Sequence, residues 1–210
     1  MPVPVVYRKT SVSPEYTFKD LATGQAYLRL YGGDYYSGAN AYVMSTEQFY
    51  AHSGVSVDGG GTNNINFDIL LKKSITIEGH AILNVPILLC ADNTGPYTIT
   101  TTADLSLWVS GAALTLIASG AAIHTDTISA NQGKQRLIAL KLAVPKTVIK
   151  SGEYFRLKLL TPDADTGGSR RQIGFCHDPY NRTSISLPDF SVTYSVPTWT
   201  IIDLPIKISE

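Results

Sequence analysis

The segment from Pro96 to Ser110, PYTITTTADLSLWVS, decides the fold class because its side chains alternate in character. Tyr97 and Ile99 fall on one face of an extended chain, and Thr98 and Thr100 fall on the other. Successive side chains of a β-strand point to opposite faces, so this alternation is typical of a strand with one buried face. The segment therefore predicts a half-buried strand.

The same alternation recurs along the chain, in segments separated by turn clusters rich in Gly, Asn and Asp. Only STEQFYAHSG, residues 45–54, carries helix start and stop signals. We therefore expect an all-β protein, an antiparallel β-sandwich of jelly-roll type with one short helix at most. The alternating segments are 26–32, 64–71, 74–90, 135–145, 153–162 and 199–208.

Two glycines and the prolines near the start refine this prediction. Gly79 interrupts the alternation of residues 74–90, and Gly120 divides a small, apolar stretch at 110–125 that we interpret as a pair of core strands. Pro2 and Pro4 favour extended backbone, so residues 1–15 are expected to form an extended arm. Residues 16–210 are then expected to form a single jelly-roll domain, because nothing marks a boundary within them.

The charge balance argues against some classes of partner. The chain has 210 residues, 17 basic and 17 acidic, and only 16% of its residues are charged, against a usual value of about 25%. Nucleic acids and anionic membranes are bound through clustered Lys and Arg, so neither is expected as a partner. A net charge near zero favours association with other protein instead.

The start of the chain lacks the basic and long apolar regions of a secretory signal, and no apolar run reaches the roughly 20 residues that a spanning helix needs. We therefore expect a soluble protein that is made in a cytosol.

Residues that could bind a metal do not form a recognisable motif. Cys90 and Cys176 lie in unrelated contexts without C-x-x-C spacing and are expected to be buried free thiols. Asp163 and Asp165 imitate the start of a calcium loop, but the later ligand positions are glycines. We expect a solvated hairpin loop there, with neither metal nor cofactor.

Catalytic patterns are equally absent from the sequence. His80 follows Glu78, and His124 precedes Asp126, at spacings that place each pair on one face of a strand. No third group converges on either pair, so we interpret both as sheet-rim pairs rather than acid–base or metal sites. No catalytic residue is assigned, and the chain is not expected to be an enzyme.

Tyrosine is the residue that points to binding. The chain has 12 Tyr and 6 Phe, and several of the tyrosines fall in or beside the predicted loops. Tyrosine is enriched at interfaces because it combines a stiff apolar ring with a polar end. The loop YGGDYY is consistent with a subunit contact, with a glycan platform at Tyr35 and Tyr36, or with ordinary loop packing. The residues expected at a protein interface are Pro2, Val3, Pro4, Val5, Val6, Tyr7, Tyr31, Tyr35 and Tyr36.

Three segments resemble parts of the jelly-roll structural proteins of tailed bacteriophages: YTFKDLATGQAYLRLYGG at 16–33, IKSGEYFRLKL at 149–159 and WTIIDLPIKI at 199–208. The resemblance implies a decoration or cement protein located in the virion. Its implied partners are further copies of itself, as a trimer, and the major capsid protein or another virion protein. The alternative is a carbohydrate- or receptor-binding β-sandwich module of a virion fibre or tail.

Overall fold

A computed structural model describes residues 25–34, 42–51, 54–58, 63–161, 171–180, 191–193 and 198–207. Within these ranges the regular elements are strands, and none of the described segments is a helix able to cross a membrane. The strands are β1 (Gln25–Asp34), β2 (Tyr42–Ser45), β3 (Val55–Asp58), β4 (Asn63–Leu70), β5 (Ile75–Ala91), β6 (Tyr97–Ser110), β7 (Leu114–Ile128), β8 (Gln132–Ile149), β9 (Tyr154–Thr161), β10 (Arg171–Cys176), β11 (Ser191–Thr193) and β12 (Thr200–Lys207).

The strands hydrogen-bond into one curled sheet in the order β11-β8-β5-β12-β1-β2-β4-β9-β6-β7, and β10 joins β5 to β3. The expected all-β class is thus confirmed. Most neighbours are antiparallel, but β2 pairs with β4, and β11 with β8, in parallel. The jelly-roll order is not confirmed, because the strands form one continuous mixed sheet.

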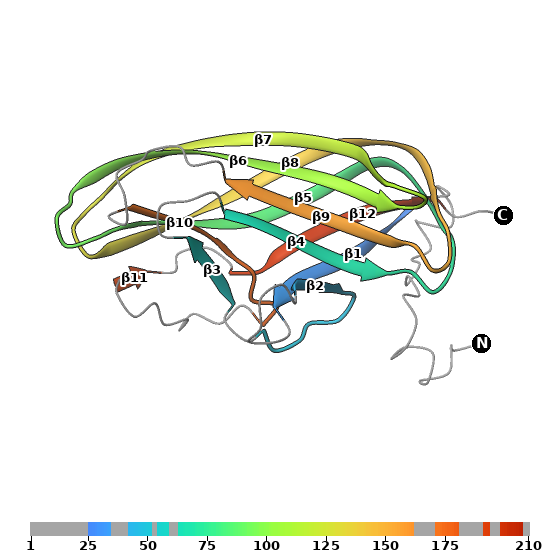
Figure 1. The fold of residues 1–210 in the computed structure, drawn as a ribbon, viewed down its shortest axis with the longest axis horizontal. Helices are drawn as coiled ribbons and strands as arrows, with labels where there is room; N and C mark the ends of the chain where they lie inside the picture. The colour runs from blue at the N-terminus through green and yellow to red at the C-terminus, as the bar shows by residue number, and fades with distance from the viewer. Residues whose placement is uncertain are drawn as a thin grey trace.

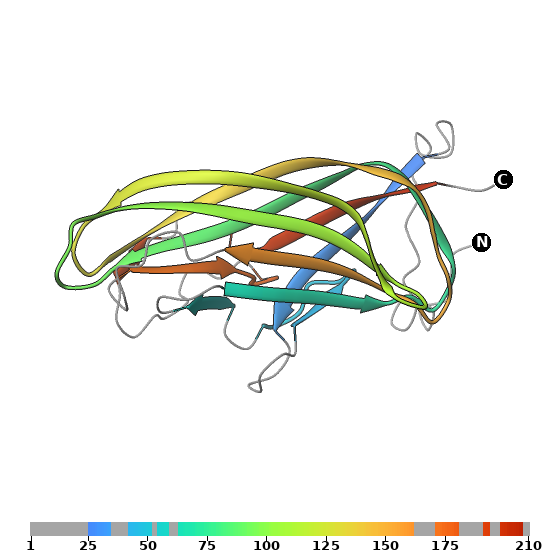
Figure 2. The same ribbon diagram turned by 45° about the horizontal axis from the view of Figure 1, so that its top comes forward.

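The sheet curls over itself into an elongated body along which the longest strands, β5 to β8, run (Figures 1 and 2). β7 and β8 are joined by a short turn and lie against each other. Gly120 of β7 permits this approach, because a Cβ there would stand 2.7 Å from Cδ2 of Leu142 in β8. The first and last long strands of the curl therefore close over a common interior.

That interior is filled by the alternating apolar side chains that the sequence predicts. In β6, Ile99, Leu105 and Leu107 are buried while the threonines between them face outward, and β4, β9 and β12 add further buried residues. Phe67, Phe155 and Phe175 are the largest fully buried side chains. Burial of such rings contributes about 1.5–3 kcal/mol each.

The second half of β5 is buried on both faces, from Val85 to Ala91. Its odd-numbered residues face the main core, and Leu88 and Cys90 face the opposite side. The predicted break at Gly79 is confirmed, since that residue has φ 125° and the ladder with β8 shifts register there.

Two local predictions are wrong. Residues 110–125 do not form a strand pair joined at Gly120: β7 runs straight through that glycine, and most of its side chains are exposed or half-buried. The expected helix at 45–54 does not form in its described part, because β2 ends at Ser45 and its Oγ accepts a hydrogen bond from the N–H of Glu47 (3.1 Å). The expected arm at residues 1–15 lies outside the described residues, so the proposed domain division stays a prediction.

Candidate functional site at the strand-end junction

Asp34 and His177 form a buried polar pair where several strands meet. Asp34 ends β1, His177 directly follows β10, and the Nδ1 atom of His177 lies 3.4 Å from the Oδ1 atom of Asp34. The His177 side chain is fully buried. We call this region, with Gly54 and Thr200, the strand-end junction.

Aromatic rings enclose the imidazole. The rings of Tyr42 and Phe67 meet the His177 ring edge-on, at centroid distances of 5.3 and 5.8 Å, and they also contact each other. Within the part of the chain that the structure describes, the Nε2 atom of His177 is buried without a hydrogen-bond partner. The ring is therefore fixed by packing and by its carboxylate.

Backbone hydrogen bonds tie three chain segments to this pair. The N–H of Gly54 donates to Oδ1 of Asp34 (3.2 Å), and the N–H of His177 donates to the carbonyl of Gly54 (2.8 Å). The Thr200 hydroxyl donates to the carbonyl of Cys176 (2.7 Å). Since Gly54 has φ 70°, which side chains disfavour, the glycine suits this turn. The junction thus fixes the ends of β10 and β12 and the start of β3 relative to β1.

A close approach at Gly33 brings two further segments together on the outer side of the junction. A Cβ at Gly33 would lie 2.7 Å from Cζ of Phe49 and 3.0 Å from Cδ of Pro179, so only glycine fits here without a shift. The residues that follow, Tyr50 and Tyr180, pack against each other with ring centroids 6.2 Å apart. We call these two rings the Tyr50–Tyr180 platform.

A second aromatic pair adjoins the junction on β1. Tyr31, one of the predicted interface residues, contacts Trp199 at a centroid distance of 6.3 Å. Trp199 lies between Thr198, whose carbonyl accepts a hydrogen bond from the N–H of Asp178, and Thr200. The other predicted interface and glycan residues lie outside the described residues, and their assignment stays a prediction: Pro2, Val3, Pro4, Val5, Val6, Tyr7, Tyr35 and Tyr36.

The sequence gave no signal for the Asp34–His177 pair. Asp34 follows two glycines at the end of a predicted strand, and His177 stands in FCHDP after another. Only the strand order β1-β12-β5-β10 brings them together, and that order cannot be read from local patterns.

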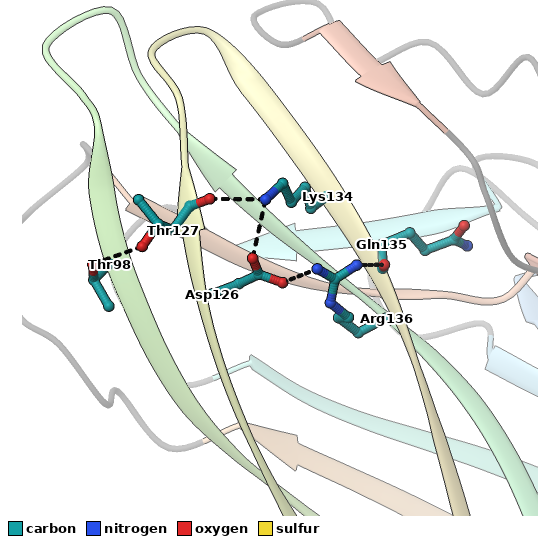
Figure 3. Close-up of polar contacts among 6 residues, drawn as sticks. All are labelled: Thr98, Asp126, Thr127, Lys134, Gln135 and Arg136. Carbon is teal, nitrogen blue, oxygen red and sulfur yellow. Dashed lines mark hydrogen bonds and ion pairs between the residues drawn. The ribbon is translucent and has the colours of Figure 1, made fainter.

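Asp126 forms a separate polar cluster at the turn between β7 and β8 (Figure 3). Its carboxylate pairs with Lys134 (3.1 Å) and with Arg136, and Lys134 also donates to the Thr127 carbonyl. Burial opposes ionisation of Asp126, but the hydrogen bond from Lys134 and the charge of Arg136 outweigh it, so the pKa of Asp126 is lowered. The cluster fastens β7 to β8, and its carboxylate is engaged by cations rather than by the neighbouring His124.

The remaining predicted pairs and thiols are structural in their surroundings. Glu78 pairs with Lys207, while His80 is exposed. Cys90 and Cys176 are buried free thiols, as predicted, and burial raises the pKa of each to about 12. Asp163 and Asp165 lie outside the described residues. Among the described residues, no three His, Cys, Asp or Glu side chains come together as a metal site.

Comparison with known proteins identifies the fold. No protein-family model and no curated protein matches the chain. A CocE/NonD family hydrolase from Staphylococcus aureus matches 87% of the chain with a TM-score of 0.53 and 8% identity. An α-amino acid ester hydrolase matches 86% (TM-score 0.55, 8% identity), and an aminopeptidase from a Thaumarchaeota archaeon matches 88% (TM-score 0.57, 6% identity). The chain spans 36–37% of the length of these three chains.

These matches correct the expected family. The solved structures that share this fold are hydrolases rather than virion proteins, so the phage resemblance is wrong. The decoration role, the fibre or tail alternative, the virion location and the expected lack of enzymatic activity are wrong with it. The quoted hairpin and strand motifs describe strand geometry, which unrelated functions share, and they therefore carried no functional information.

Proposed function

We propose that this chain is the β-sandwich module of a hydrolytic enzyme that acts on ester or amide bonds. The observation that supports the proposal is the match of 86–88% of the chain to an ester hydrolase, an aminopeptidase and a CocE/NonD hydrolase at TM-scores of 0.53 to 0.57. The neighbours cleave bonds of related chemistry, as their names state, which narrows the proposed substrate class.

The hydrolytic centre requires a second unit, either another segment of the same polypeptide or another chain. This module corresponds to little more than a third of the length of the matched hydrolases. A general base must reach the proton it removes, directly or through one water. His177 resembles a base oriented by a carboxylate, but its ring is fully buried behind Tyr42 and Phe67. We therefore assign the Asp34–His177 pair the role of positioning the strand-end junction.

Co-expression tests this proposal. The tagged chain is produced together with the products of the reading frames that adjoin its own, and the purified material is assayed with p-nitrophenyl butyrate and L-alanine p-nitroanilide. We expect hydrolysis of at least one substrate by material that co-purifies with the tagged chain, and none in a parallel purification without it. The proposal fails if the chain, alone and with those products, hydrolyses neither substrate above the untagged control.

A further inference from the structure

Tyr50 and Tyr180 present two large aromatic rings to solvent. The residues are 67% and 53% exposed, and their rings are tilted by 54° at a centroid distance of 6.2 Å. Two tilted rings in contact form an open corner with ring faces on both sides. Paired exposed rings are uncommon on a soluble surface, and such patches often mark binding sites.

The platform is held in place from beneath. Phe49 and Pro179, which precede the two tyrosines, both pack on Gly33 at distances that leave no room for a side chain. The N–H of Tyr180 also donates to Oδ1 of Asp178 (3.3 Å). The rings are thus carried on two anchored segments, which lowers the entropy lost when a ligand binds.

The charges around the platform favour a cation. The described segments that build it, 45–51, 176–180 and 198–200, contain the exposed Glu47 and the buried Asp178 but neither Lys nor Arg. The face of an aromatic ring carries a negative partial charge, which attracts ammonium groups placed within about 6 Å of the centroid. An anionic ligand would meet like charge on these segments.

We propose that the Tyr50–Tyr180 platform binds organic ammonium groups. The ammonium lies in the corner between the two ring faces, with the Glu47 side chain on the same segment as Tyr50 adding long-range attraction. A small amine and the lysine side chain of a peptide both supply this group, and the test separates them. The inference concerns binding by this chain alone and does not depend on hydrolytic activity.

Isosteric ligand pairs isolate the contribution of the charge. Choline is compared with 3,3-dimethyl-1-butanol, and the peptide acetyl-Gly-Gly-Lys-amide with acetyl-Gly-Gly-norleucine-amide, by NMR titration of the intact chain. We expect one or both cations to bind and their neutral isosteres to bind at least fivefold more weakly. Choline alone indicates a small-amine site, and the lysine peptide alone indicates a peptide site. The proposal is overturned if neither cation binds in the millimolar range, or if charged and neutral partners bind equally.

Variants locate the site. Tyr50→Ala and Tyr180→Ala should each weaken cation binding about two- to fivefold, the size expected for one exposed cation–π contact. Tyr50→Phe and Tyr180→Phe keep the ring faces and should retain binding, which separates ring loss from misfolding. Tyr27→Ala is the matched control, because Tyr27 is an exposed tyrosine (45%) on β1, paired with Pro205 rather than with the platform. Equal binding by the wild-type chain and both alanine variants would place the cation elsewhere and refute the assignment.

Discussion

Asp34 and His177 come from opposite halves of the chain, and a carboxylate oxygen of the first lies 3.4 Å from an imidazole nitrogen of the second in the buried strand-end junction. The same carboxylate oxygen accepts the N–H of Gly54, whose carbonyl accepts the N–H of His177. One aspartate therefore connects the end of β1 with the segments that enter β3 and leave β10.

Replacing this aspartate should destabilise the fold. Asp34→Ala removes the acceptor for Gly54 and leaves a buried imidazole without its partner, which we expect to cost about 2–3 kcal/mol. Urea unfolding followed by tryptophan fluorescence measures the loss. Asp68→Ala is the control, because Asp68 pairs with Arg156 on a partly exposed surface, where ion pairs contribute about 0–1 kcal/mol. An Asp34 variant no less stable than the Asp68 variant would show that the junction does not hold the strands together.

Gly33 should tolerate no side chain. The Cβ of Gly33→Ala would lie 2.7 Å from Phe49 and 3.0 Å from Pro179, so both anchored segments must shift. We expect a loss of about 1–3 kcal/mol, the usual cost of overpacking, measured by thermal unfolding. At Gly111 the nearest atom would be 3.5 Å away, an ordinary contact, so Gly111→Ala should change stability by less than about 0.5 kcal/mol. Equal melting temperatures for the two variants would contradict the packing described here.

The thiols should react only after unfolding. Both are buried, and burial raises the pKa of each to about 12, so almost no thiolate exists at neutral pH. In the β5–β10 ladder Cys90 lies opposite Gln172, four residues from Cys176 and thus about 13 Å along the strand, too far for a disulfide. Ellman's reagent should label neither thiol in the native protein and both in guanidinium chloride. Rapid labelling of the native chain would mean that one of them is accessible.

The Asp126 cluster predicts a dependence on acidity. The lowered pKa of Asp126 means that its ionised form stabilises the fold above the unfolded-state pKa of about 3.9, and that this contribution is lost as the pH falls through the lower folded-state value. Asp126→Asn should therefore be less stable than the wild type at pH 7, by about 1 kcal/mol for two partly exposed ion pairs. The difference should shrink below about pH 4. A gap between the two unfolding curves that stays constant down to pH 2 would exclude this role.

Local patterns predicted the strands but not what depends on their arrangement. The Pro96–Ser110 alternation matches the burial in β6 because period two is a property of each strand by itself. The stretch around Gly120 was misread because Ala, Gly and Ser are small enough for an exposed strand or a core. Ser45 has the chemistry of a helix cap, but its hydroxyl instead accepts a local hydrogen bond at the end of β2.

The candidate site was beyond sequence reasoning for a different reason. The strand-end junction requires the register of β1, β12, β5 and β10 together, and no residue near Asp34 specifies His177 as its partner. The tyrosines, in contrast, were rightly selected as a notable residue type, although their pairing emerges only where Phe49 and Pro179 meet on Gly33.

The predicted self-association remains to be tested, and β7 is the strand on which to test it. β7 lies at one end of the sheet order, pairs with β6 among the described strands, and has neither a charged residue nor a proline from Leu114 to Ile123. Natural edge strands usually carry charges or prolines that prevent pairing with another copy. Ile123 is 70% exposed at this edge. We expect the wild-type chain to exceed its monomer mass of 22.7 kDa in light scattering as concentration rises, and Ile123→Lys to reduce that mass. Leu70→Lys, at a 58% exposed position on the interior strand β4, should have no such effect. A wild-type chain that stays monomeric at every concentration, or an equal response to both lysines, would rule out association through the β7 edge.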